Sequence, residues 1–141
     1  MDHLTDNFDF GSIEAGTIVD VGGSHGQVSI PIARNNPQVK CIVQDLPDTI
    51  VGLDSRLPED LKDRISGMAH DFLTPQRVKG ADIYLFRLMD ISMKAFNNAR
   101  ERDPETWATL FSKADPRFQL KGITLPPEAR MAIILAEWQG E

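Results

Sequence analysis

The sequence has a single cysteine, no long apolar run and no signal peptide, and each shortage excludes a class of protein. With Cys41 as its one thiol, the chain of 141 residues cannot form an internal disulfide, so we expect a reducing compartment. No apolar run is long enough to cross a bilayer. The first ten residues are acidic and lack the apolar segment of a secretion signal. The sequence therefore predicts a cytoplasmic protein without a membrane partner.

Basic residues are also scarce. The chain has 15 Lys and Arg against 21 Asp and Glu, which gives a net charge of −6 at pH 7, and the charges are interspersed along the sequence. A nucleic-acid-binding face needs clustered cations to neutralise phosphates. We therefore expect no nucleic-acid partner, and the partner we expect is a small molecule.

What the sequence does contain is an alternation of apolar strands and helical patterns. The β-branched run Thr17–Val21 is typical of a buried parallel strand, and Gln27–Asn35 has helical spacing that ends at Asn36-Pro37. Further strands are expected at Val39–Gln44, Arg64–Met68 and Ala81–Phe86. Further helices are expected at Thr49–Leu53, Ile91–Arg100 and Pro104–Ala114.

Two strand-like runs, Phe118–Thr124 and Met131–Trp138, follow these elements and predict a closing antiparallel pair. Alternating strands and helices indicate an α/β fold with a mostly parallel sheet. We expect one domain over residues 17–141, preceded by a loose lead-in over residues 1–16. Asp48 and Asp103 are candidate N-caps for the helices that follow them.

The strongest local motif is the segment DVGGSHG at residues 20–26, placed between the first strand and the first helix. A dinucleotide fingerprint fails, because Ser24 and Gln27 occupy its second and third glycine positions, and no Gly-Lys-Ser or Gly-Lys-Thr of a P-loop occurs. The acid-x-Gly-x-Gly-x-Gly loop of methyltransferases is matched by Asp20, Gly22 and Gly26, with Ser24 in the middle slot. The alternative is a glycine turn that serves strand–helix packing alone.

Two later acids strengthen the ligand interpretation. Asp45 ends the second strand, where an acid of a doubly wound fold accepts hydrogen bonds from ribose hydroxyls. Asp71 and Phe72 follow the third strand, where a carboxylate accepts from an adenine amino group and a ring stacks on the base. The alternatives are a surface acid or helix cap at Asp45 and a loop residue at Asp71.

Together, the segments VDVGGSHG, VQDLP, HDF and ADIYLFR resemble the metal-independent O-methyltransferases of plant and fungal secondary metabolism. The resemblance implies a Rossmann-like class I methyltransferase sheet, S-adenosylmethionine as the cofactor, and a hydroxyl acceptor on a small aromatic or polyketide-like metabolite. It implies no metal. The cofactor-binding residues that it implies are Gly22 and Gly23 at the methionine end, Asp45 at the ribose, Asp71 and Phe72 at the adenine, and the nearby Arg87.

The sequence departs from this family in two places. We expect this chain to lack the family's N-terminal helical domain, and the sequence passes from ADIYLFR directly to LMDISM, without the segment that carries the fifth strand and the catalytic histidine. His3, His25 and His70 do not occupy the base position, so we assign no catalytic residue and expect poor methyl transfer by this chain alone.

These departures leave two alternatives open. One is an active O-methyltransferase, and the other is a cofactor-binding or regulatory remnant that lacks the general base. Without the fifth strand, the closing hairpin pairs with the fourth strand, or an open sheet edge remains for another chain. We therefore expect self-association or docking on a full-length homologue.

Overall fold

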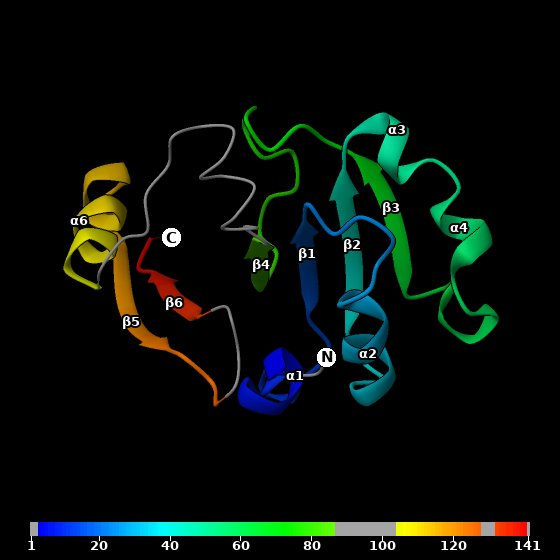
Figure 1. The fold of residues 1–141 in the computed structure, drawn as a ribbon, viewed down its shortest axis with the longest axis horizontal. Helices are drawn as coiled ribbons and strands as arrows, with labels where there is room; N and C mark the ends of the chain where they lie inside the picture. The colour runs from blue at the N-terminus through cyan, green and yellow to red at the C-terminus, as the bar shows by residue number, and fades with distance from the viewer. Residues whose placement is uncertain (1–2, 87–103, 128–131, 141) are drawn as a thin grey trace. The chain divides into compact units, whose positions relative to one another are not determined.

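The computed structural model describes residues 3–86, 104–127 and 132–140, which belong to two units (Figure 1). The larger unit spans Phe8–Leu88, and the smaller combines Met1–Asn7 with Met89–Glu141. The larger unit holds a four-stranded sheet, whereas the smaller holds a two-stranded sheet. The expected helix Ile91–Arg100, the expected cap Asp103 and the cofactor candidate Arg87 lie outside the described residues.

The sheet of the larger unit has the order β3-β2-β1-β4, and every neighbouring pair is parallel. Its strands are β1 (Thr17–Val21), β2 (Lys40–Asp45), β3 (Ile65–Ala69) and β4 (Ile83–Phe86). The strand order reverses between β1 and β4. In open α/β sheets ligands bind at such a switch point, outside the carboxyl ends of the strands. The expected parallel α/β sheet is therefore confirmed.

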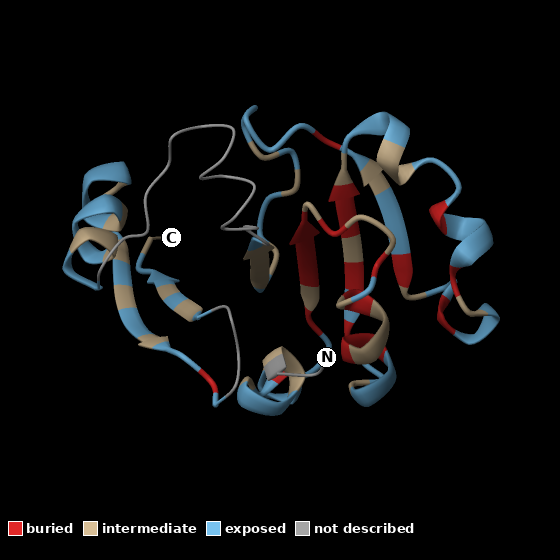
Figure 2. Cartoon of the chain, viewed as in Figure 1, coloured by how far each residue is buried: buried red, intermediate tan, exposed pale blue. Residues whose placement is uncertain are grey.

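The buried residues of this unit include residues of β1, β2 and α2 (Ser29–Asn35), as the red segments of Figure 2 show. The strand register places Ile18, Cys41 and Ile65 side by side, and all three are buried. Burial raises the pKa of the Cys41 thiol to about 12, and the buried Asp20 adds to this shift. The thiol is therefore protonated at neutral pH, which agrees with an inert core cysteine.

Helix α2 begins at Ser29, two residues later than Gln27, where the sequence pattern placed its start. Pro31 supplies the physical reason. A proline has no backbone N–H, so it is tolerated in the first turn of a helix but not after it. A start at Ser29 places Pro31 within that first turn.

Two short elements lie in the N-terminal segment, whose character as a loose lead-in stays a prediction. Residues His3–Asn7 form α1, and Phe10–Ile13 form the 3₁₀ turn η1. The Asp9 side chain accepts a hydrogen bond from the Gly11 N–H at 3.0 Å, and Phe10 is buried within the larger unit. Phe10 anchors the segment because burying its ring gains hydrophobic free energy.

Two short helices, α3 (Pro47–Ile50) and α4 (Leu53–Arg56), occupy the place of the expected Thr49–Leu53 helix, and the turn η2 (Glu59–Leu61) follows. Asp48 is not an N-cap. The cap of α3 is Leu46, and Pro47 occupies the first helical position, to which its fixed φ angle is suited. Asp48 therefore lies within the first turn.

The smaller unit contains α6 (Pro104–Ala114) and the antiparallel strands β5 (Phe118–Thr124) and β6 (Ile133–Trp138), which confirms the closing hairpin. Aromatic rings join the helix to the hairpin: the ring centroids of Phe111 and Phe118 are 5.7 Å apart, and those of Phe118 and Trp138 are 4.9 Å apart. Across the described ranges, no helix has the length and apolar character needed to traverse a membrane.

Candidate functional site

The loop at residues 22–26 lies at the carboxyl ends of β1 and β2. It is tied to the second strand because the N–H groups of Gly22 and Gly23 both donate to the Gln44 carbonyl, at 2.8 and 3.1 Å. These N–H groups are therefore already satisfied within the protein. A ligand at this loop would therefore contact the surface of the loop and the hydrogen-bond acceptors beside it.

Asp45 is the acceptor beside the loop. Its Oδ2 accepts from the Ser24 N–H at 2.9 Å, and its Oδ1 accepts from the Leu46 N–H at 2.8 Å. A carboxylate has about four acceptor positions, so these two bonds fix its orientation and leave about two positions for a ligand. The side chain is half-buried, which strengthens its hydrogen bonds relative to those of a fully solvated acid.

Gly22 and Gly23 face different surroundings. Gly22 has a φ of +74°, and no atom lies within 4 Å of the position that a Cβ would take there. Its peptide therefore borders open space, as a loop that receives a ligand requires. A Cβ on Gly23, in contrast, would lie 2.6 Å from the Asp20 carboxyl carbon and 2.8 Å from a Val43 methyl. Gly23 is thus needed for packing, and its contact with a ligand stays a prediction.

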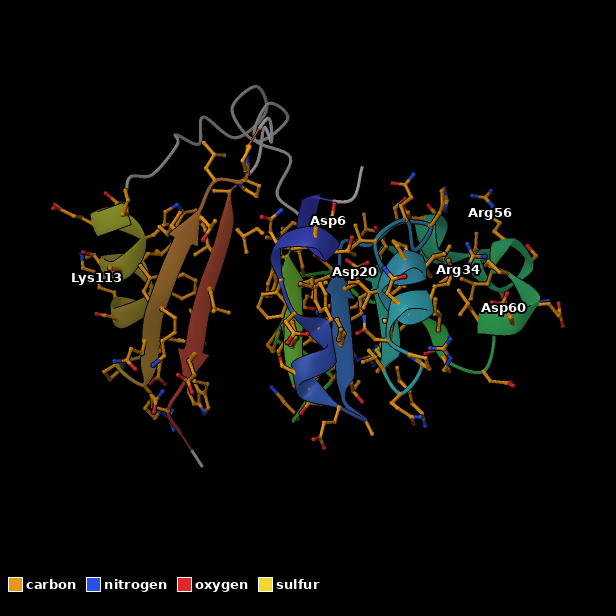
Figure 3. The ribbon with its side chains drawn as sticks, turned by 90° about the horizontal axis from the view of Figure 1, so that it is seen from below. Asp6, Asp20, Arg34, Arg56, Asp60 and Lys113 are labelled. Atoms are coloured by element: carbon orange, nitrogen blue, oxygen red, sulfur yellow. The ribbon has the colours of Figure 1, made fainter. Side chains whose placement is uncertain are left out.

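Asp20 supports the loop from inside the protein. Its side chain is fully buried, and its Oδ2 accepts from the Ser29 hydroxyl at 2.8 Å, which joins β1 to α2. Figure 3 shows Asp20 within the larger unit, whereas Arg56 and Asp60 lie at its outer side. The acid of the glycine motif is therefore a structural group that holds the loop against the helix.

Ser24 occupies the motif's middle glycine slot with a left-handed backbone, at a φ of 53°. For an L-residue this conformation costs about 1 kcal/mol more than for glycine.

We expect Ser24→Gly to keep the fold and to raise the free energy of unfolding by up to about 1 kcal/mol. The gain is reduced by the larger conformational entropy of glycine in the unfolded chain. Urea unfolding measures the change. A loss of more than about 1 kcal/mol would show that the Ser24 side chain stabilises the loop.

The predicted adenine-side residues follow β3, next to the end of β2. The His70 N–H donates to the Asp45 carbonyl at 2.8 Å, which ties the two strand ends together. Asp71 Oδ1 accepts from the Leu73 N–H at 2.9 Å, and the Phe72 side chain is about half exposed. An open cavity of about 380 Å³ is lined by Pro47, Ala69, His70, Asp71, Thr74, Pro75 and Arg77. The structure thus brings Asp45 and Asp71 to neighbouring strand ends.

A partly buried amide pair next to this site was not identified from the sequence. The side chains of Gln44 and Gln76 exchange two hydrogen bonds of 2.8 Å, and Gln76 also accepts from the Val78 N–H at 3.0 Å. The pair fastens the connection after β3 to the strand that carries Asp45. Its only signal in the sequence is a glutamine within the otherwise apolar end of the second strand.

Two of the three histidines can be placed in the structure. The His25 ring lies 2.8 Å from the guanidinium of Arg56. His70 is buried, and no described residue makes a hydrogen bond with its Nδ1. The sequence interpretation, which assigned none of them as the catalytic base, stays a prediction.

Comparisons with known proteins identify the family to which this chain belongs. The family model for the O-methyltransferase domain matches residues 1–89. The chain is 33% identical to the chlorophenol O-methyltransferase of Trichoderma longibrachiatum over 96% of its length. It spans only 41% of that relative. The alignment extends over 190 positions, so within the aligned region the relative has residues that this chain of 141 residues lacks.

Solved structures share the fold. The mitomycin 7-O-methyltransferase matches 96% of this chain with a TM-score of 0.82 at 15% identity, and the match covers 52% of that protein. An O-methyltransferase from neocarzinostatin biosynthesis matches 92% of the chain with a TM-score of 0.75 at 17% identity, over 50% of its own length. That structure contains S-adenosyl-L-homocysteine and 1,4-dihydroxy-2-naphthoic acid. At these identities the likeness establishes the fold alone, a class I methyltransferase sheet.

Proposed function

Because this chain belongs to the O-methyltransferase domain family, we propose that it binds S-adenosylmethionine at the carboxyl ends of β1 and β2 and methylates a hydroxyl of a small aromatic or polyketide-like metabolite. When bound, this cofactor supplies a methyl group on a sulfonium, which a hydroxyl oxygen can attack. This chain spans only 41% of the chlorophenol O-methyltransferase and 49% of a second fungal relative, so the whole reaction is part of the proposal.

The observation that carries the proposal is the position of Asp45 beside the glycine loop. The two backbone N–H groups of Ser24 and Leu46 orient the carboxylate and leave about two acceptor positions, and Gly22 in the same loop borders open space. A ribose presents two adjacent hydroxyl donors, which match these positions. A carboxylate held by such bonds is ready to bind without first reorganising.

The other cofactor contacts follow from the same placement. We propose that the loop around Gly22 and Gly23 borders the methionine end, and that Asp71 and Phe72 take the adenine amino group and ring. The hydrogen bond from the His70 N–H to the Asp45 carbonyl supports this, since it keeps the ribose and adenine sides at a fixed spacing. Arg87, as a basic residue near the cofactor, remains part of the proposal.

The proposed acceptor is a phenol. The chlorophenol O-methyltransferase is named for such an acceptor, and the neocarzinostatin enzyme was crystallised with a dihydroxynaphthoic acid. Transfer moves the methyl from sulfur to oxygen, and the hydroxyl proton leaves to a base or to water. An ordinary phenol has a pKa of about 10 and is mostly protonated near neutral pH. With no base assigned in this chain, we expect it to favour acidic phenols that ionise in solution.

The test is in two stages. Calorimetric titration of the purified chain with S-adenosylhomocysteine and S-adenosylmethionine measures binding, which we expect to be saturable with one site per chain. Radiolabelled methyl transfer is then measured with a chlorinated phenol and with its unsubstituted parent. Binding followed by faster transfer to the acidic phenol supports the proposal. A chain that is folded by circular dichroism but binds neither cofactor contradicts it.

A further inference from the structure

Gln44 joins two loops of the candidate site. It is fully buried and is the penultimate residue of β2, next to Asp45. Its backbone carbonyl accepts from the N–H groups of Gly22 and Gly23, at 2.8 and 3.1 Å. Its side chain exchanges two hydrogen bonds of 2.8 Å with Gln76, which lies in the connection between β3 and β4. The glycine loop and this connection are therefore both attached to the residue that precedes Asp45.

The segment from the end of β3 to Gln76 is held by β2 at both of its ends. At its start, the His70 N–H donates to the Asp45 carbonyl at 2.8 Å. At its end, Gln76 is bonded to the side chain of Gln44, the preceding residue of β2. The predicted adenine-side residue Asp71 lies between these two attachments. Because consecutive residues of β2 supply both of them, the segment cannot shift along the strand without breaking one.

The amide pair has a full set of hydrogen bonds. Besides its bond to Gln76, Nε2 of Gln44 donates to Sδ of Met68 at 3.3 Å, which uses its second hydrogen. Oε1 of Gln76 accepts a further bond from the Val78 N–H at 3.0 Å. A buried amide that loses its partner is costly, so this arrangement is strongly favoured over others. A segment fixed in this way needs no reorganisation before a ligand binds.

We propose that the Gln44–Gln76 amide pair positions the cofactor site, by setting the spacing between the ribose acceptor Asp45 and the adenine-side segment. This inference rests on the proposed function, because it concerns the same S-adenosylmethionine site. Both glutamines are positioning residues, since each acts through the segment that it holds. Breaking the pair in a folded chain should therefore weaken cofactor binding, although Asp45 keeps its own bonds to the backbone.

The first test compares Gln76→Leu with Tyr84→Phe. Leucine has a similar volume but makes no hydrogen bond, so this variant breaks the amide pair. The control removes the Tyr84 hydroxyl, which donates to the Val78 carbonyl at 3.0 Å and holds the same connection farther along the chain. In calorimetric titration with S-adenosylhomocysteine, we expect at least about fivefold weaker binding for Gln76→Leu and little change for Tyr84→Phe. Circular dichroism measures whether each variant is folded.

The second test is a rescue by Gln76→Glu at low pH. A protonated carboxyl can exchange the same two hydrogen bonds with the Gln44 amide, because its O–H donates and its C=O accepts. An ionised carboxylate only accepts, so it cannot bond to Oε1 of Gln44. Affinity relative to the wild type at the same pH should therefore be at least about threefold lower near pH 8 than near pH 5. The relative affinity of Gln76→Leu should not change between these pH values, which controls for other titrating groups.

Three outcomes overturn the inference while the wild type still binds, so that the proposed function stands. The first is equal affinity of the wild type and Gln76→Leu, and the second is an equal loss in Tyr84→Phe. The third is a relative affinity of Gln76→Glu that does not depend on pH, which decides the matter even if Gln76→Leu does not fold. A folded wild-type chain that binds no cofactor contradicts the proposed function, and the inference falls with it.

Discussion

Replacing Asp45 by alanine is expected to weaken the binding of S-adenosylhomocysteine by about 1–3 kcal/mol, or roughly 5- to 150-fold in Kd. Two losses add in this variant. The ribose hydroxyls lose their proposed acceptor, and the Ser24 N–H loses the bond of 2.9 Å that orders the glycine loop. Calorimetric titration of both proteins under identical buffer and salt measures the difference.

Two further variants separate these losses from the loss of charge. Asp48→Ala removes the same charge three residues later, from an exposed position in α3, and should bind within about twofold of the wild type because exposed charges are strongly screened. Asp45→Asn keeps a carbonyl acceptor but loses the second, and should fall between wild type and Asp45→Ala. Equal affinity of the wild type and Asp45→Ala would show that Asp45 does not hold the ribose.

Gly23→Ala is expected to lower the free energy of unfolding by about 1–3 kcal/mol, as overpacking of a filled interior does. The added Cβ would lie 2.6 Å from Oδ2 of Asp20 and 2.8 Å from Cγ1 of Val43, well inside contact distance. Asp20 is fully buried and bonded to Ser29, and Val43 is fully buried in β2, so neither group has room to move aside. Urea unfolding monitored by circular dichroism measures the loss.

Gly122→Ala is the matched control for this substitution. No atom lies within 4 Å of the position of its Cβ, on the exposed middle of β5, so its effect should stay within about 0.5 kcal/mol. If Gly23→Ala were as stable as the wild type, the loop would have to sit farther from β1 and β2 than the structure shows. Reduced cofactor affinity with unchanged stability would instead place Gly23 against the ligand.

The sequence by itself determined the elements whose signals are local. The strand Thr17–Val21 was predicted with its observed bounds because its β-branched residues favour extended backbone, and the strand Phe118–Thr124 was predicted likewise. The helix Pro104–Ala114 begins at its proline as predicted. The sequence also placed Asp45 at the end of a parallel strand. The family resemblance rested on such short segments, and the family match supports it.

Only the tertiary structure decided which groups meet across the chain. Burial of Phe10, the Gln44–Gln76 pair and the inward position of Gly23 depend on residues far apart in sequence, which no local pattern encodes. Strand pairing within each unit was also decided by the tertiary structure, because it depends on which edges come together in space. β1 lies between β2 and β4, and β5 pairs with β6. A strand's sequence sets its tendency to extend, but its neighbours are chosen by long-range packing and hydrogen bonding.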